Sequence, residues 1–155
     1  MPQKIRDFGR RYRPPLTRGL PGEALDAVLR LRPEPATWSA LEYACHVRDA
    51  FLLYDWRVGK ALTEDRPVFA AMGRDEVVVE RDYNAQDPAA VLEELEAGAQ
   101  RLADRLAGVT GQDWDRLGVR EGEDLSVAWM ARNALHEGGH HLLDIGRVLR
   151  HVRGR

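Results

Sequence analysis

The sequence is poor in cysteine, in lysine and in long apolar runs. Cys45 is its one cysteine, so an internal disulfide framework is excluded and a reducing compartment suits the chain. No apolar segment approaches the roughly 20 residues that cross a membrane, and the N-terminal residues lack the apolar core of a signal peptide. We therefore expect a cytoplasmic protein without a membrane partner.

The sequence also lacks a large excess of either positive or negative charge. The formal net charge is −2, although charged residues make up 31% of the chain. Nucleic acid and anionic membranes are therefore not expected as partners. Lys4 and Lys60 are the only lysines, so arginine dominates the basic residues. That bias is typical of coding in a GC-rich genome.

The length and the hydrophobic content favour one folded unit. A chain of 155 residues, 44% of them hydrophobic, buries about 70% of its surface on folding and needs no disulfide. Residues 1–20 are basic, interrupted by proline and aperiodic, which predicts an irregular N-terminal arm. Residues 21–155 are expected to form the domain.

Helical signals divide this domain into four segments, at residues 23–32, 39–63, 87–108 and 126–151. Ser39 and Glu42 match a capping box at the start of the second segment. Asp87 and Pro88 are typical first residues of the third, and Ser126 begins the fourth. Four helices with no convincing sheet predict an all-α, up-down four-helix bundle.

Residues 64–87 break the helical pattern and predict a long crossover between the second and third helices. Within it, residues 76–80 fit either a short strand or one turn of helix. Excursions of this length are commonly lids or binding loops, although a mobile crossover fits equally well.

Histidines indicate a metal site. His136 and His140 lie four residues apart on one helix, so both imidazoles can reach a single ion. His46, on the second helix, is the only upstream histidine and the candidate third ligand. Gly138 and Gly139 each cost about 0.5–1 kcal/mol in a helix relative to alanine, which indicates that something approaches this backbone closely.

Two other interpretations of this segment remain open. Most polar residues of the last helix share one face with His140, so they can equally form a solvated surface. His136-Glu137-Gly138-Gly139-His140 also matches HExxH, in which the glutamate activates water beside a zinc ion. No glutamate follows His140 to complete such a site, so a protease is not expected.

Two segments resemble a known family. Residues 38–49, WSALEYACHVRD, and the pattern HxxxHHxxD from His136 to Asp144 are similar to the signature segments of the DinB-like superfamily. The resemblance implies an up-down four-helix bundle with a divalent ion, zinc or nickel, bound by His46, His136 and His140. It also implies that His141 supports the ligands. Where close relatives often carry Asp-Pro, this chain has Glu137-Gly138-Gly139.

The resemblance also suggests an activity. Family members include thiol-dependent S-transferases and a mycothiol-dependent maleylpyruvate isomerase, and mycothiol is an actinobacterial thiol, which agrees with the arginine-rich composition. A small-molecule thiol and an electrophile are then the expected partners, and a homodimer through helix surfaces near Leu52 and Trp56 is the expected assembly. We expect groups that select the electrophile in the crossover, at Arg74, Asp75, Arg81, Asp82 and Tyr83.

The motifs and the resemblance together leave three functions to be tested. The first is a metal-dependent S-transferase or isomerase that uses a low-molecular-weight thiol. The second is a non-enzymatic metal-binding or interaction protein on the same bundle. The third is a metal-dependent hydrolase in which Glu137 is the catalytic base.

Overall fold

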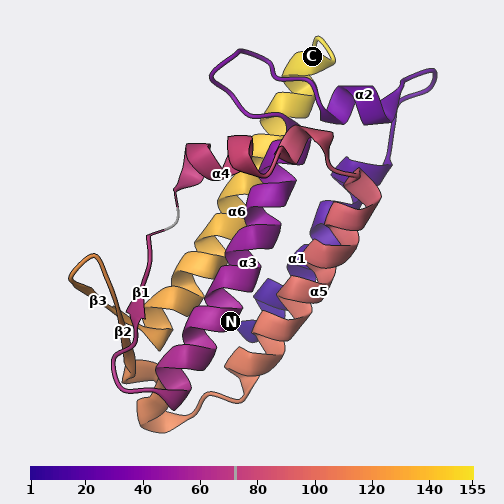
Figure 1. Cartoon of the computed structure of the whole chain (residues 1–155). Coiled ribbons are helices and arrows are strands. Elements are labelled where there is room, and N and C mark those ends of the chain that lie inside the picture. Colours follow the sequence, from indigo (N-terminus) through magenta and orange to yellow (C-terminus); the bar gives the residue numbers. More distant parts are fainter. Residues whose placement is uncertain (72) are drawn as a thin grey trace.

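The computed structural model describes residues 1–71 and 73–155, without the side chain of residue 74. Four helices of this chain form a bundle. They are α1 (Pro2–Thr17), α3 (Ala40–Thr63), α5 (Pro88–Ala107) and α6 (Val127–Val152) (Figure 1). Their buried faces meet in one apolar core. The predicted all-α four-helix bundle is confirmed. Within the described residues, none of the helices combines the length and the hydropathy that a membrane span needs.

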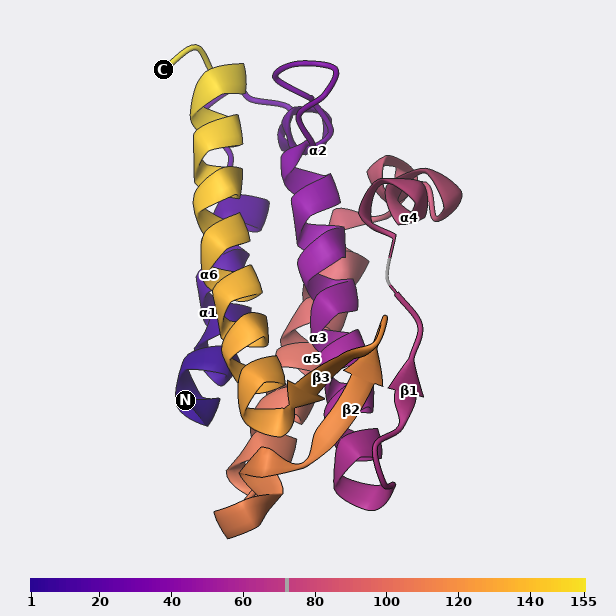
Figure 2. The same ribbon diagram turned by 90° about the vertical axis from the view of Figure 1, so that its left-hand side faces the viewer.

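Each helix of the bundle packs against two others: α3 lies beside α5 and α6, and α1 contacts these same two helices. Arg48, early in α3, pairs with Glu94, early in α5, at 2.9 Å, so these helices run parallel. Arg6 at the start of α1 pairs with Asp104 near the end of α5 at 2.7 Å, so α1 runs the opposite way (Figure 2). The predicted crossover is confirmed, and because it returns along the bundle it makes α3 and α5 parallel.

The predicted irregular arm is wrong, because residues 2–17 form α1, a full member of the bundle. Its apolar stripe, Ile5, Phe8, Tyr12 and Leu16, is buried in the core. Pro14 and Pro15 lie inside its C-terminal part, where each removes one backbone N–H hydrogen bond to the preceding turn. The predicted first helix at 23–32 shrinks to α2 (Leu25–Leu29), a short segment at one end of the bundle (Figure 1).

The crossover contains β1 (Val68–Phe69), α4 (Arg74–Glu80) and the 3-10 turn η1 (Tyr83–Ala85). Residues 76–80, for which the sequence allowed either a strand or a turn of helix, are therefore helical.

A small sheet, which the sequence did not indicate, lies between α3 and the start of α6. After the 3-10 turn η2 (Gly111–Asp115), β2 (Leu117–Arg120) pairs antiparallel with β3 (Glu123–Ser126) and parallel with β1. This pairing holds Arg120 at the bundle surface beside α3 and α6.

Helix α3 begins as its capping signal predicts. The Ser39 hydroxyl accepts a hydrogen bond from the Glu42 backbone N–H at 3.1 Å, and the Glu42 carboxylate accepts one from the Ser39 N–H at 2.8 Å. Glu42 is itself held by Arg32 at 2.6 Å. The cap fixes where the helix starts and thereby the direction of His46, two turns further on.

At Gly138 the helix α1 comes close to α6. A Cβ at Gly138 would lie 2.5 Å from the Phe8 ring, whereas a Cβ at Gly139 would lie 4.0 Å from it. The Tyr12 hydroxyl also donates to the Gly138 carbonyl at 2.7 Å. The close approach inferred from this glycine pair is therefore made by α1.

This contact predicts opposite effects for two neighbouring alanine substitutions. Gly138→Ala should lower the free energy of unfolding by about 1–3 kcal/mol, because the methyl group overpacks the α1 contact. Gly139→Ala, its matched control, should raise it by up to about 1 kcal/mol through helix propensity. Urea unfolding monitored by circular dichroism measures both, and equal effects would contradict the contact.

Candidate metal centre

Two buried imidazoles and one carboxylate converge between α3 and α6. The Nε2 atom of His46 lies 2.9 Å from the Oε2 atom of Glu137, and the Nε2 atom of His141 lies 3.1 Å from the same oxygen. The ligand atoms of these three residues all lie within 4.8 Å of one another. His46 and His141 are 4% and 3% exposed, so protein encloses both rings, whereas the Glu137 side chain is 20% exposed.

The surrounding groups hold both imidazoles in place. The Nδ1 atom of His141 lies 3.0 Å from the Oδ2 atom of Asp144, so both nitrogens of this ring contact a carboxylate, Asp144 on one side and Glu137 on the other. Tyr43 stacks on the His141 ring at 5.3 Å, and Trp38 packs against the His46 ring at 5.4 Å. A carboxylate behind a histidine fixes which ring nitrogen is free to bind an ion.

The hydrogen-bonding pattern of the cluster has a place for a proton or a metal ion. Hydrogen bonds from His141 and then His46 hold the pKa of the Glu137 carboxyl far below its ordinary value, although burial opposes them. When the Nδ1–H of neutral His141 donates to Asp144, its Nε2 has only a lone pair to present to the Glu137 oxygen. Either an added proton or a metal ion must then lie between these atoms. Two imidazole nitrogens and a carboxylate oxygen are ligands that suit zinc and nickel.

The predicted triad of His46, His136 and His140 is not the group that the structure assembles. His46 lies in the cluster, but His136 and His140 point to solvent, where their rings stack on each other at 5.4 Å. The His140 side chain is 52% exposed. One residue turns a helix by about 100°, so the neighbouring pair of Glu137 and His141 faces α3 instead.

From the sequence, Glu137 is predicted to be a catalytic base and His141 a supporting group. The structure brings both within ligand distance of His46. A signal for His141 was present, since it continues the buried stripe of α6 that contains Ala134, Gly138 and Ile145. His140, His141 and Asp144 form a second, more exposed group of potential ligands.

A cavity of about 140 Å³ adjoins the cluster on one side. It is lined by His46, Ala50, Leu53, Tyr54, Arg57, Arg120, Asn133 and Glu137. The Asn133 amide donates a hydrogen bond to the Tyr54 hydroxyl and so ties α6 to α3 at its edge. No local pattern in the sequence pointed to Arg57 or Arg120, because they come from α3 and from the unpredicted strand β2.

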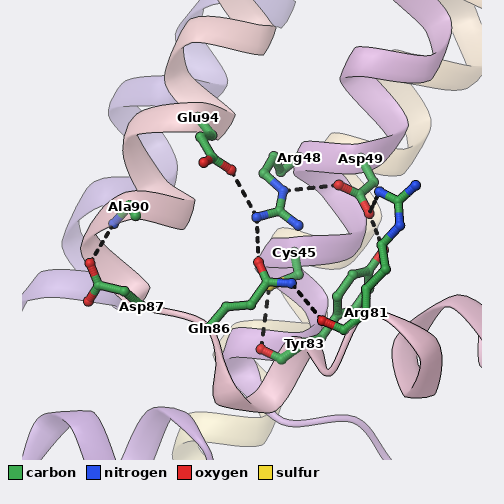
Figure 3. Close-up of polar contacts among 9 residues, drawn as sticks. All are labelled: Cys45, Arg48, Asp49, Arg81, Tyr83, Gln86, Asp87, Ala90 and Glu94. Atoms are coloured by element: carbon green, nitrogen blue, oxygen red, sulfur yellow. Dashed lines mark hydrogen bonds and ion pairs between the residues drawn. The ribbon is translucent and has the colours of Figure 1, made fainter.

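The crossover residues expected to select an electrophile have mixed positions. The Tyr83 hydroxyl donates to buried Asp49, and Arg81 pairs with the same carboxylate at 3.1 Å (Figure 3). These two residues therefore anchor the crossover on α3. Asp75 borders a hollow beside His140, Asp82 is exposed, and the side chain of Arg74 lies outside the described residues.

Cys45 is not an internal nucleophile. It is fully buried on α3 next to His46, and its Sγ faces the Tyr83 carbonyl oxygen at 3.7 Å (Figure 3). Burial raises the pKa of its thiol to about 12, whereas the thiolate is the reactive form. Any thiol chemistry at this site therefore needs a thiol from outside the chain.

Comparisons with known proteins agree with this architecture. A sequence model of the DinB superfamily matches residues 13–145. The chain is also similar to YfiT from Bacillus subtilis, described as a probable metal-dependent hydrolase with an unusual four-helix bundle topology. The TM-score is 0.86 at 17% sequence identity, and the match covers 96% of this chain and 83% of that one. No curated protein matches the sequence significantly.

Proposed function

The chain belongs to the DinB superfamily, and from this premise we propose that it is a metal-dependent enzyme that uses a low-molecular-weight thiol. His46, Glu137 and His141 hold a zinc or nickel ion, and the reaction is S-transfer to a small electrophile or a related isomerisation. The observation that carries the proposal is the convergence of two imidazoles on one carboxylate beside a cavity.

Three protein ligands leave a coordination position for a reactant. A bound ion would lower the pKa of a thiol that reaches this position and so keep its sulfur nucleophilic at neutral pH. Asp144 orients the His141 ring, and Leu53 and Ala50 give the cavity an apolar wall. Because Cys45 is buried with a raised pKa, the thiol is a co-substrate, for which mycothiol is our candidate.

The cavity argues against hydrolysis with Glu137 as the general base. Among the described residues that line it, Glu137 is the only carboxylate, and it is occupied by His46 and His141. A hydrolase that uses a carboxylate as general base would need one other than Glu137, whereas a thiol or a water whose proton the ion has displaced needs none. Because YfiT is described as a probable metal-dependent hydrolase, a metal-dependent hydrolase is the second candidate.

Conjugation of a thiol to monobromobimane tests the proposal. In this reaction a C–S bond forms, the C–Br bond breaks, bromide leaves and the thiol proton passes to solvent. Zinc- or nickel-loaded protein should speed the fluorescence increase with mycothiol or bacillithiol, and His46→Ala should remove the effect. His140→Ala is the matched control and should keep most of the rate.

Two outcomes would contradict the S-transferase proposal. If no thiol reacts above the metal-free background, a metal-binding protein without this activity becomes the better interpretation. If metal-loaded protein instead hydrolyses p-nitrophenyl acetate without any thiol, the hydrolase alternative takes its place.

A further inference from the structure

Two arginines line the cavity beside the metal cluster, and neither forms a close ion pair with an acid in the described chain. Arg57 is 2% exposed, and its polar contact is a hydrogen bond from Nη2 to the Ala70 carbonyl oxygen at 2.7 Å. Arg120 comes no closer to a carboxylate than 3.9 Å, at Glu121. Arg57 lies over the Phe69 ring at 5.3 Å, and Arg120, whose side chain is 29% exposed, lies over the Trp129 ring at 5.9 Å. A ring face does not neutralise a charge, and a buried arginine is normally paired with an acid, so Arg57 above all needs an explanation.

Each of these side chains has a nitrogen that nothing in the described chain satisfies. The Nε atoms of Arg57 and Arg120 are buried and have no hydrogen-bond partner among those residues. A buried donor without a partner costs about 1–3 kcal/mol, and more when the group is charged. Burial lowers the pKa of the Arg57 guanidinium, and nearby Arg120 acts in the same direction.

The rest of the cavity does not offset these charges. Its other polar groups include the neutral side chains of Tyr54 and Asn133, which bind each other. Glu137 is shared between His46 and His141, and a divalent ion in that cluster would make the local charge still more positive. The cavity therefore attracts an anion.

We propose that Arg57 and Arg120 bind the carboxylate of a small electrophilic substrate and direct its reactive end toward the cluster of His46, Glu137 and His141. A guanidinium donates paired N–H groups that match a planar carboxylate. A water occupies about 10–15 Å³ of such space, so a cavity of about 140 Å³ suits an acid of a few carbon atoms. Because the electrophile is the smaller of the two proposed reactants, the carboxylate is assigned to it.

This inference rests on the proposed function for the identity of the second reactant, but binding can be measured without a thiol. Zinc-loaded protein labelled with ¹⁵N-arginine is titrated with propanoate and with propanamide, its neutral analogue of equal size. Propanoate should shift the Nε–H signals of Arg57 and Arg120, and propanamide should not. Arg57→Gln and Arg120→Gln should each raise the propanoate Kd by about tenfold to a hundredfold.

Matched variants separate binding from folding. Arg132→Gln removes an exposed arginine of α6 and should leave the Kd unchanged. Arg57→Lys keeps the charge but loses the planar donor pair, so it should bind propanoate more weakly than the wild type even if Arg57→Gln fails to fold.

The results of these titrations distinguish which kind of ligand binds in the cavity. Equal binding of propanoate and propanamide, or an unchanged Kd in both Arg57→Lys and Arg120→Gln, would overturn the carboxylate site. Tighter binding of inorganic phosphate than of propanoate would overturn the assignment to a carboxylic acid. Propanoate binding without any bimane conjugation would keep this site and reject the thiol reaction. A Kd for N-acetylcysteine that depends on Arg57, with no binding of propanoate, would overturn the assignment of the carboxylate to the electrophile.

Discussion

His141→Ala should remove most of the bound metal, whereas His140→Ala, one residue away, should retain it. The reason is the direction of each ring: His141 faces His46 and Glu137, while the His140 side chain is 52% exposed. Loss of a supporting residue of a metal site lowers affinity by about 10–100-fold. Loss of a ligand should therefore weaken binding by at least about a hundredfold.

Equilibrium dialysis against zinc or nickel, followed by elemental analysis, measures this difference. His136→Ala is a second control, since it removes the ring that stacks on His140. Asp144→Ala should give an intermediate loss, because it frees the His141 ring without removing a ligand. Metal loss in His140→Ala together with full occupancy in His141→Ala would reject the cluster and favour the triad of His46, His136 and His140.

Asp49→Ala should produce a large loss of stability. Asp49 is 7% exposed and accepts hydrogen bonds from Arg48 at 3.0 Å, from Arg81 at 3.1 Å and from the Tyr83 hydroxyl (Figure 3). Its removal leaves buried Arg48 with less compensation and frees the crossover from α3. Breaking a buried ion pair in this way costs about 3–5 kcal/mol.

Asp55→Ala is the matched control on the same helix. Asp55 pairs with Arg105 at 2.6 Å, and that arginine is 39% exposed, so water can replace much of the interaction. Its loss should cost less than about 1 kcal/mol. Urea unfolding of both variants tests the contrast, and similar midpoints would show that the Asp49 cluster contributes little to stability.

Local sequence signals were sufficient to predict the helices that begin with an N-cap residue. Ser39, Asp87 and Ser126 each accept a backbone N–H hydrogen bond at the start of α3, α5 and α6, as predicted. A cap is formed by residues within four positions of one another, so its chemistry is readable without knowing the fold. The long crossover followed from the same evidence, because it is what lies between two such helices.

Other elements depended on distant partners and could not be predicted locally. Helix α1 combines a basic, proline-containing sequence with a buried stripe, and packing against α5 and α6 stabilises it. The sheet joins Val68 to Val119, which are far apart in the chain. Neither strand is long enough to carry a clear alternation by itself.

In the metal cluster, the sequence determines the kinds of ligand, and the tertiary structure determines which of them meet. The segment from His136 to His141 contains two overlapping pairs at a spacing of four, His136 with His140 and Glu137 with His141. The sequence by itself determined that such a pair on the last helix, together with His46, is suited to a metal ion. Only the packing of α6 against α3 decided which pair, because successive residues differ by about 100° around a helix. The contact of Gly138 with Phe8 fixes that rotation and turns Glu137 and His141 toward His46.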